Sequence, residues 1–460
     1  MAGKYKAYPE YKNSENAWLG DVPMDWNLIP LKYLSRFSGG GTPSKDNPEY
    51  WNGDIPWVSP KDMKTSRIIS TIDNVTKKAI KQSSTNLLNK GALLVVVRSG
   101  ILQHSIPVAI NDVPVTLNQD MKAIKFNSKL NAQYAMYLIT GSQTALLLEW
   151  RKQGATVESI EQEYLANTLF PVPSLKEQDI IIKFLEHETV KIDTLIEKQK
   201  QIIQLLKEKR QAVISHAVTK GLNSNAKMRD SGVEWLGEVP AHWVVRRLKH
   251  TSSLQSGIPK GKDLAGKINI SIPMLRVANV QDGYLDLNDI HEIAIEPDQL
   301  ERYSLQYGDV LMNEGGDNDK LGRGAVWKSQ ISPCIHQNHV FAIRPYSMEP
   351  EWLDLLTRSS YAKFHFYMVA KQSTNLASIS STNIKETPLV IPPKEERQEI
   401  LDYVFNKLGV FEDVEKNVLT QIALLQERRT ALISAAVTGK IDVRNWEAPK
   451  TIKTNKEVAA

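Results

Sequence analysis

The residues that most often carry catalysis or bind metals are scattered singly along this sequence. Gly39 to Lys45 is rich in glycine and ends in lysine, but its spacing differs from that of a phosphate-binding loop. The nine histidines are expected to be surface or core residues, and Cys334 is the only cysteine, so the sequence predicts neither a disulfide nor a cysteine-based metal site. Asp298 and Glu301 could be fitted to a nuclease motif, but Pro297 ahead of them favours a turn that opens a helix. We therefore expect no active site in this chain.

The composition is that of a globular protein in a reducing compartment. The 460 residues predict about three domains of roughly 150 residues each, and the 42% hydrophobic and 24% charged residues are ordinary values. Ala92 to Val97 is the longest apolar run, far short of the about 18 residues of a membrane span. Met1 to Lys6 lacks the apolar stretch of a secretory signal. The net charge of +5 leaves nucleic acid open as a partner without requiring it. We predict a cytoplasmic protein without membrane segments.

The strongest signal is an internal repeat that covers nearly the whole chain. Trp18 to Trp26 (WLGDVPMDW) returns as Trp235 to Trp243 (WLGEVPAHW), an offset of 217 residues. Later the offset is 219, where Gln153 to Ile160 (QGATVESI) matches Gln372 to Ile379 (QSTNLASI). An offset that drifts so little is not chance, and it far exceeds the roughly 20 to 50 residues of a solenoid repeat. The chain therefore carries two copies of one unit.

Each copy begins with mixed sequence and ends in one long helical pattern. Short β-rich runs among Gly, Pro, Ser and Asn loops predict an α+β domain. Ser174 and Glu177 have the form of a helix-capping box, and Gly221 and Gly439 stand where the two helices should end. The predicted order is a domain over residues 1–173, a helix over 174–222, a second domain over 223–392, a second helix over 393–443 and a flexible basic tail over 444–460.

The two long helical segments carry an apolar residue at every seventh position, which favours a coiled coil in which they are each other's partners. Such a stripe could instead pack on the core of its own domain, but a helix of about 40 to 45 residues, roughly 60 to 65 Å long, would overhang that domain. Because the second helix has to run back, we expect an antiparallel pair, a pseudo-two-fold axis and neighbouring chain ends. The expected seam is Leu185, Ile192, Ile203, Leu206, Val213, Val404, Phe411, Val418, Leu425 and Leu432.

The order of domain, helix, domain and helix resembles the DNA-specificity subunit of type I restriction-modification systems. Single motifs are weak evidence, but two complete sets in order, over about residues 8 to 443, are specific. The second copy departs from the first, with Met274-Leu-Arg276 where Trp57-Val-Ser59 stands, which limits the transfer of residue roles. The motifs that carry the resemblance are the segments that begin at Trp18 and Trp235, Thr42-Pro-Ser44, and the helix starts Pro173 to Gln178 and Pro392 to Gln398.

The resemblance implies a non-catalytic chain whose two target-recognition domains each read one half of a split, asymmetric site in double-stranded DNA. The helices would set the gap between the halves and hold two methyltransferase subunits. Two motor and restriction endonuclease subunits would complete the restricting complex. S-adenosylmethionine, ATP and Mg²⁺ would then belong to the partner subunits.

DNA contacts are expected from polar and basic residues in loops that recur in both copies. Lys, Arg, Ser and Thr bind phosphates, and Arg, Asn, Gln and Lys read base edges. For any single residue, an ordinary solvated loop position is as plausible as a contact. The candidates in the first copy are Thr42, Ser44, Lys45, Lys61, Arg98, Gln103, Lys152 and Gln153. Those in the second copy are Lys260, Lys262, Arg276, Asn279, Asn313, Lys320, Arg323, Lys371 and Gln372.

The tryptophans of the repeated motif could stack on bases, but we expect them to pack in cores, because a specificity surface should differ between the copies. They are Trp18, Trp26, Trp235 and Trp243.

Two other classes of function remain open. A coiled-coil scaffold whose domains bind only proteins would explain the helices but not the paired, diverged polar loops. A small nuclease or a fused single-chain restriction enzyme would require motifs that the sequence lacks. Salt-sensitive binding of one DNA sequence would exclude the scaffold, and cleavage by the purified subunit alone would support the enzyme.

Overall fold

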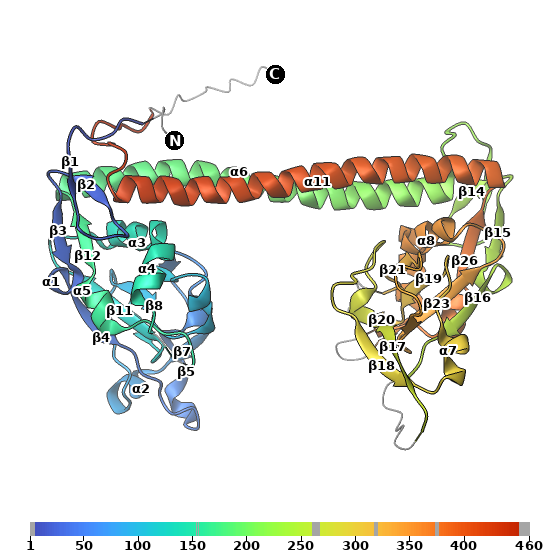
Figure 1. Cartoon of the computed structure of the whole chain (residues 1–460), viewed down its shortest axis with the longest axis horizontal. Helices are drawn as coiled ribbons and strands as arrows, with labels where there is room; N and C mark the ends of the chain where they lie inside the picture. The colour runs from blue at the N-terminus through green and yellow to red at the C-terminus, as the bar shows by residue number, and fades with distance from the viewer. Residues whose placement is uncertain are drawn as a thin grey trace. The chain divides into compact units, whose positions relative to one another are not determined.

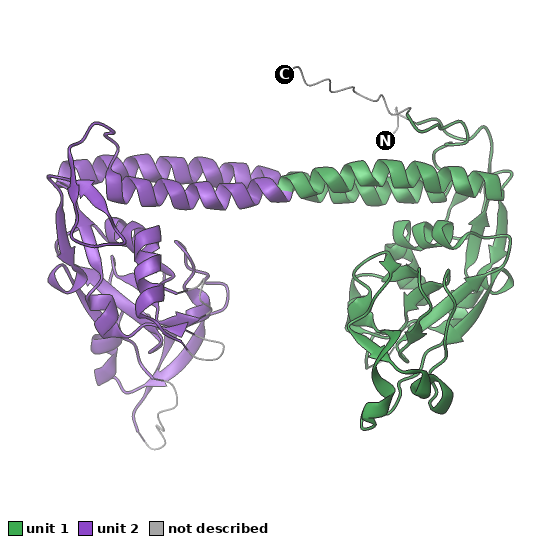
Figure 2. Ribbon diagram, turned by 180° about the vertical axis from the view of Figure 1, so that it is seen from behind, with its two compact units in different colours: residues 1–199, 420–460 green, residues 200–419 purple. Residues whose placement is uncertain are grey.

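Two long helices, α6 (Leu175–Lys220) and α11 (Lys394–Val437), organise the fold (Figure 1). The computed structural model describes residues 5–152, 154, 156–259, 267–316, 321–372 and 377–449. The chain divides into unit 1, residues 1–199 and 420–460, and unit 2, residues 200–419 (Figure 2). The division falls inside both long helices, whereas the sequence placed the domain limits at the helix ends. Each unit therefore consists of one mixed domain and half of each helix.

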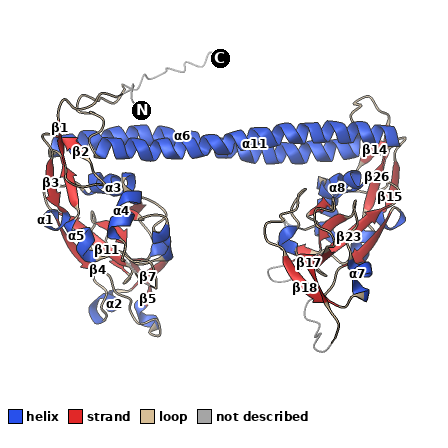
Figure 3. Ribbon diagram, viewed as in Figure 1, coloured by secondary structure: helices blue, strands red, loops and turns tan. Residues whose placement is uncertain are grey.

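In unit 1 the central sheet has the order β4-β11-β8-β9-β6 (Figure 3). Its middle strand, Leu-Leu-Val-Val, is buried at every position, as expected for a strand covered on both faces. Its strands are β4 (Ser35–Gly39), β6 (Arg67–Ile68), β8 (Leu93–Val96), β9 (Val108–Asn111) and β11 (Met121–Phe126). Beside it lie the sheet β10-β5-β7 and the pairs β1-β2 and β3-β12. These strands are β1 (Tyr11–Asn13), β2 (Asp21–Pro23), β3 (Asn27–Pro30), β5 (Trp51–Val58), β7 (Asp73–Val75), β10 (Thr116–Leu117) and β12 (Leu169–Val172).

Helix α3 packs on strands β8 and β9 of this sheet, and both long helices complete its core. Trp26, Trp150 and Phe170 pack in one apolar cluster with Phe184 of α6 and Ile433 of α11. The long helices are thus part of the core and also pair with each other. The helices are α1 (Leu31–Leu34), α2 (Lys77–Gln82), α3 (Ala132–Gly141), α4 (Gln143–Trp150) and α5 (Gln162–Asn167), with the 3-10 turns η1 (Pro48–Tyr50), η2 (Pro60–Asp62) and η3 (Gly100–Gln103).

Unit 2 repeats this arrangement, which confirms the predicted pair of similar α+β domains. The pairs β13-β14 and β15-β26, the sheet β16-β23-β19-β21 and the sheet β18-β17-β22 correspond to the elements of unit 1. A further small sheet, β20-β25-β24, lies in unit 2. The strands are β13 (Met228–Asp230), β14 (Glu238–Pro240), β15 (Val244–Arg247), β16 (Ser252–Ser256), β17 (Ile270–Leu275), β18 (His291–Ile295), β19 (Val310–Asn313), β20 (Gly315–Gly316), β21 (Gly324–Val326), β22 (Ile335–His336), β23 (Val340–Pro345), β24 (Lys371–Gln372), β25 (Ala377–Ser378) and β26 (Pro388–Ile391).

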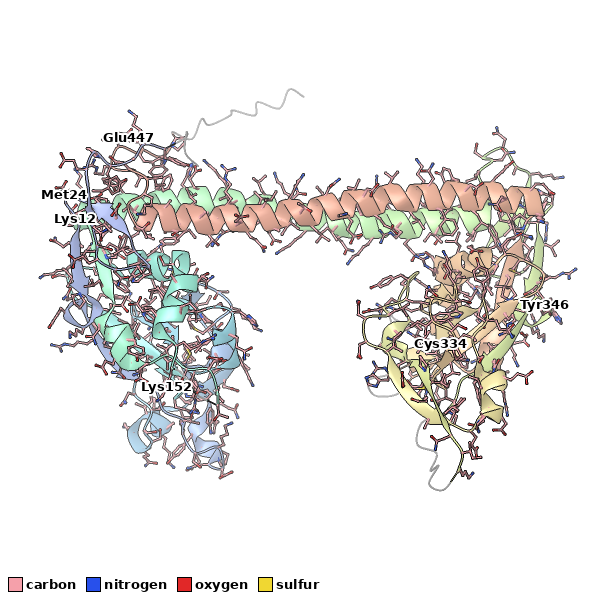
Figure 4. The ribbon with its side chains drawn as sticks, in the orientation of Figure 1. Lys12, Met24, Lys152, Cys334, Tyr346 and Glu447 are labelled. Carbon is pink, nitrogen blue, oxygen red and sulfur yellow. The ribbon has the colours of Figure 1, made fainter. Side chains whose placement is uncertain are left out.

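The helices of unit 2 include the one expected after Pro297, which begins at Asp298. This confirms that Asp298 and Glu301 belong to a helix start. Cys334 lies inside unit 2 (Figure 4), where burial raises the pKa of its thiol to about 12. The helical elements are η4 (Leu248–His250), η5 (Val277–Asn279), α7 (Asp298–Tyr303), α8 (Pro350–Arg358), α9 (Ser360–Val369) and α10 (Ser381–Lys385).

Helix α6 closely matches the predicted range of 174–222, whereas α11 begins as predicted but ends at Val437, before the predicted limit of 443. Ser174 Oγ accepts a hydrogen bond from the Glu177 amide at 3.3 Å, and Gly221 and Gly439 have φ angles of +74° and +71°. Along the described residues, no helix combines the length and the apolar composition that a membrane span needs.

Within each unit the two helix segments pack against each other. In unit 1, Asp193 pairs with Arg429 at 2.8 Å and Gln199 Nε2 donates to Gln421 Oε1 at 2.9 Å. Because residue numbers rise along α6 while those of the partners fall along α11, the two helices are antiparallel. In unit 2, Arg210 pairs with Glu415 at 3.2 Å. All ten residues of the predicted seam are buried or half-buried. Its buried members are Leu185, Ile192, Leu206, Val404, Val418 and Leu432, and its half-buried members are Ile203, Val213, Phe411 and Leu425.

The described residues nearest the two chain ends meet in unit 1, as predicted. The Asp442 amide donates to the Lys6 carbonyl at 2.7 Å, and the Arg444 guanidinium lies 4.7 Å from the centre of the Tyr8 ring. Trp446 packs edge-on against Phe184 of α6. The prediction of a flexible tail from residue 444 is therefore wrong at its start, because these side chains supply an apolar and cationic contact that fixes it. Residues 450–460 of that tail lie outside the described residues.

The tryptophans of the repeated motif are core residues in two of four cases. Trp26 and Trp243 are each 1% exposed, as expected of framework positions, and Trp18 is half-buried. Trp235 is 42% exposed and stacks on the His365 ring with centroids 5.5 Å apart, so its expected core position is wrong.

Candidate functional site

A cleft of about 610 Å³ in unit 1 gathers three of the predicted contact residues, Thr42, Lys45 and Lys61. Two tryptophans form its wall. The rings of Trp51 and Trp57 meet edge to face at 5.1 Å, and their indole N–H groups donate to the carbonyls of Ser44 and Gly41 at 3.0 and 3.1 Å. These bonds fix the loop that carries Thr42 and Lys45.

The same loop lies very close to the strand opposite. A Cβ placed on Gly40 would stand 2.0 Å from the carbonyl oxygen of Asn118, so only glycine fits there. The matching Gly257 in unit 2 makes the same approach to His336. The backbone frame of the cleft is thus common to both copies.

A capped 3-10 turn presents Lys61 at the edge of this cleft. The Asp62 carboxylate accepts hydrogen bonds from the Ser59 amide and hydroxyl, both at 2.8 Å, and from the Ile72 amide at 2.9 Å. Lys61 stays exposed on the turn. On the other side of the cleft, Thr42 hydrogen-bonds Gln119.

Arg98 lies at the end of the cleft, joined to it by Asp120. Arg98 Nε donates to Asp120 Oδ1 at 2.7 Å, and the Arg98 side chain is 55% exposed. Its backbone pairs with Ser159, which also accepts the Lys152 amide at 2.9 Å. Arg98 and Lys152 are therefore neighbours on one edge. Figure 4 places Lys152 in the part of unit 1 away from the long helices.

The remaining candidates of unit 1 are not part of this group. Gln103 is exposed on η3 but does not line the cleft. The side chain of Ser44 is exposed, and its backbone supports the wall. Gln153 lies outside the described residues.

In unit 2 the corresponding turn is held by different side chains. Asn279 Oδ1 accepts the Arg276 amide at 2.8 Å, and its Nδ2 donates to the carbonyls of Asp286 and Asp289, both at 2.9 Å. Arg276 pairs with the Asp289 carboxylate at 2.8 Å. Asn313 Nδ2 donates to the Val280 carbonyl at 2.9 Å.

Two asparagines among the predicted DNA contacts are buried and bind backbone carbonyls instead. Asn279 and Asn313 are each 3% exposed, and their amide groups anchor the η5 loop. This corrects their assignment as surface contacts. Asparagine satisfies nearby backbone groups well, which is why it recurs in such turns.

The other candidates of unit 2 are partly accessible. Lys371 and Gln372 are exposed on β24, and Lys371 corresponds to Lys152 of unit 1 by the repeat offset. Arg323 is half-buried and donates to Gln281 at 3.2 Å. Lys260, Lys262 and Lys320 lie outside the described residues.

The sequence did not predict the residues that position the exposed polar side chains through hydrogen bonds. Gln119 and Asp120 line the cleft of unit 1, and Glu314 pairs with His339 at 2.7 Å in unit 2. Asp120 and His339 stand 219 positions apart, so the repeat offset could have identified them as a matched pair. No group of three or more His, Cys, Asp or Glu side chains in the described part of the chain is placed to hold a metal ion.

Comparison with known proteins gives one family. The model of the type I restriction modification DNA specificity domain matches residues 23–208 and 240–423. The EcoR124I/EcoR124II specificity subunit of Escherichia coli is 40% identical over 173 residues, which span 37% of this chain and only 41% of that relative. The MjaIX specificity subunit of Methanocaldococcus jannaschii is 26% identical over 447 residues, 96% of this chain and 98% of that one.

A solved structure has a similar fold. It comes from work on complex assembly and conformational transition of the type I R-M system, and it matches with a TM-score of 0.65 at 15% identity. The match covers 90% of this chain and 98% of the other.

Proposed function

The chain belongs to the type I restriction-modification DNA specificity family, and from this membership we propose that each unit reads one half of a split, asymmetric site in double-stranded DNA. The protein is a specificity subunit with two target-recognition domains, one in each unit. The cleft between Lys45 and Lys61, with Arg98 and Lys152 beside it, is the proposed surface of unit 1. Arg276, Lys371 and Gln372 mark that of unit 2.

One observation carries this proposal: the two units share a backbone frame but differ in the polar side chains on it. The capped turn holds Ser59 and Asp62 in unit 1 and Arg276 and Asn279 in unit 2. Two identical reading domains would suit a palindromic site, because operator symmetry mirrors protein symmetry. Different side chains on one frame favour two different half-sites.

We further propose that the helix pair sets the gap between the half-sites and docks two methyltransferase subunits. Two motor and restriction endonuclease subunits would join them, and the complex would act in the cytoplasm. The complex assembly named for the structural relative supports association with such subunits. We assign catalysis, S-adenosylmethionine, ATP and Mg²⁺ to those partners, because the named relatives are specificity subunits.

Methylation mapping tests the function directly. The chain is co-expressed with its methyltransferase partner, and methylated adenines in the host DNA are located by single-molecule sequencing. The expected result is a split motif with a fixed gap and unrelated halves. A stable complex that leaves no new methylation would instead favour a protein-binding scaffold.

The spacer role has its own test. One heptad is inserted into each helix, between residues 199 and 200 and between residues 419 and 420, where neither core is interrupted. The gap should change while each half-site keeps its bases. An unchanged gap would contradict the spacer role.

The cleft is tested through its lysines. Replacing Lys45 or Lys61 by alanine should weaken binding to all sequences and lower the slope of log K against log salt by about one, as expected for a lost phosphate contact. Lys176→Ala, an exposed lysine at the start of α6, is the matched control and should leave the slope unchanged.

A further inference from the structure

The two units present one equivalent position on the same hydrogen-bonded frame. The amide of Val97 donates to the Asp120 carbonyl at 2.8 Å, and the amide of Glu314 donates to the His339 carbonyl at 2.9 Å. The carbonyls of Val97 and Glu314 in turn accept the amides of Ile160 and Ile379, both at 2.8 Å. The strand end and the facing loop therefore match between the units, residue by residue.

In unit 1 the equivalent of Glu314 is the buried Val97, and the next residue, Arg98, carries a hydrogen-bond donor that is held by Asp120, the equivalent of His339. Asp120 accepts Arg98 Nε at 2.7 Å through one oxygen and Asn118 Nδ2 at 3.3 Å through the other. This arrangement leaves the two terminal nitrogens of Arg98 without a partner among the described residues. With 55% of the side chain exposed, these nitrogens remain available to a ligand.

In unit 2 the polarity is reversed. Glu314 projects from the strand end, and its Oε2 is 2.7 Å from His339 Nδ1. The other ring nitrogen of His339 lies 3.4 Å from the Asn338 amide nitrogen. The Glu314 side chain is 28% exposed, and its Oε1 has no partner within the described residues. The side chain paired with the facing loop is thus an acceptor in unit 2 and, one residue further along the strand end, a donor in unit 1.

A carboxylate on a DNA-binding surface weakens general binding, because it repels the phosphates. This cost is offset when the carboxylate accepts a hydrogen bond from a base, and the N4 amino group of cytosine is the usual partner of Glu or Asp in the major groove. The terminal nitrogens of arginine instead bind the O6 and N7 acceptors of guanine. A Glu at this position also rejects bases that present only acceptors there.

We propose that Arg98 and Glu314 are base-reading residues of the two units, each held by the same position of the facing loop, Arg98 for guanine and Glu314 for the amino group of cytosine. Asp120 and His339 are their positioning residues. This inference rests on the proposed function, because it names which base chemistry each target-recognition domain selects.

The test maps methylation by the complex of this chain with its methyltransferase partner. Glu314→Gln keeps the shape of the side chain but adds a donor, so preference for cytosine at one position of one half-site should fall about tenfold or more. Arg98→Gln should relax one guanine in the other half-site. Glu301→Gln, an exposed carboxylate on α7, is the charge-matched control and should leave the motif unchanged.

The positioning residues are tested by coupling. Asp120→Asn and His339→Gln should relax the same base as the Arg98 and Glu314 substitutions, respectively. The double variant E314Q/H339Q should be no worse than E314Q alone, because both changes act on one contact. A purely structural role would lower thermal stability without singling out one base.

The outcomes separate this inference from the function on which it rests. A wild-type complex without a split motif would overturn the proposed function. A wild-type split motif that E314Q leaves intact would overturn the inference alone. So would a uniform loss at both half-sites, which indicates general electrostatics.

Discussion

In both units the mixed domain contacts a long helix at the end of a short helix, α3 in unit 1 and α8 in unit 2. The interactions at this junction differ between the units. In unit 1 the last residue of α3, Gly141, lies directly on α11. A Cβ on Gly141 would stand 2.7 Å from the Ser434 amide nitrogen and 2.9 Å from its Cα. The junction is a close packing of two helix backbones that only a glycine permits.

In unit 2 the corresponding helix, α8, ends at Arg358, which is 8% exposed. Its guanidinium pairs with Asp282 at 2.9 Å and with Asp354 at 3.1 Å, and its carbonyl accepts Gln211 of α6 at 2.8 Å. Lys363 also pairs with Asp282, at 3.2 Å. The junction is a network of charges in which Arg358 and Asp354 are buried and Asp282 and Lys363 are partly exposed.

The same backbone arrangement is therefore compatible with close helix packing or with an ion network, but the two junctions respond to different changes. Backbone packing is independent of pH and fails when side-chain volume is added. A buried ion network fails when one member is removed, because the remaining charges lose their compensation. Each solution can therefore be broken separately.

The largest effect is expected from Arg358→Met. This substitution leaves Asp282 with Lys363 alone and Asp354 as a buried carboxylate without a cation, so unit 2 should lose about 3 to 5 kcal/mol of stability. Hydrogen exchange measured by mass spectrometry should show faster opening in residues 200–419 and unchanged protection in the core of unit 1. Equal loss in both units would contradict a local junction.

The next largest effect concerns pH. Burial raises the pKa of Asp354 from 3.8 to about 6, against the opposing effect of Arg358. Because the folded value is the higher one, the stability from this group is fully present below pH 3.8 and is lost as the pH rises through about 6. A shift of about two pKa units corresponds to at most about 3 kcal/mol.

Asp282 does not cancel this effect in the same window. Burial tends to raise its pKa, but Lys363 and Arg358 lower it overall, so its contribution is lost only at more acidic pH. Burial lowers the pKa of His336, which titrates with the opposite sign. Because His336 titrates in both wild type and Asp354→Asn, its contribution cancels when the two proteins are compared. Urea unfolding at pH 5 and pH 7 should show a larger gain at pH 5 for wild type than for the variant. Equal gains would contradict the titration of Asp354.

The sequence was sufficient for features that repeat with a local period. The offset between Trp18 and Trp235 and the heptad stripe through Leu185 and Val404 predicted two similar domains and an antiparallel helix pair. The heptad signal needs only residues of one helix, because heptad spacing fixes which helix face is apolar, and the repeat needs only the comparison of two segments of the sequence.

The sequence was insufficient where the role of a polar side chain depends on distant partners. Asn279 and Asn313 are polar loop residues, yet they point inward to carbonyls that no local pattern identifies. Asp120 and His339 hold Arg98 and Glu314 from 22 and 25 positions away. Hydrogen bonds across such separations depend on the strand register, which short loops do not encode.

A smaller effect tests the close packing of unit 1. Gly141→Ala should force α3 away from α11 and cost about 1 to 3 kcal/mol in unit 1, as overpacking does. Gly409→Ala in α11 is the matched control, because its added Cβ meets nothing within 4 Å. The control should stabilise by roughly 0.5 to 1 kcal/mol through helix propensity. Thermal unfolding with hydrogen exchange distinguishes the two. If Gly141→Ala is also stabilising, the backbones are not in close contact.

The smallest effect compares two buried tryptophans that share a framework position. Trp26 Nε1 donates to Glu177 at 3.0 Å, and Glu177 also accepts the Tyr8 hydroxyl at 2.6 Å. The Nε1 of Trp243 has no partner among the described residues. The two Trp→Phe variants lose the same volume, so the packing terms largely cancel in their difference. Trp26→Phe should then be the more destabilising by about 1.5 kcal/mol, the lower end for a hydrogen bond to a charged group, because Tyr8 still satisfies Glu177. Urea unfolding of both variants measures this difference. If both variants lose the same free energy of unfolding, the hydrogen bond from Trp26 to Glu177 does not contribute to the stability of unit 1.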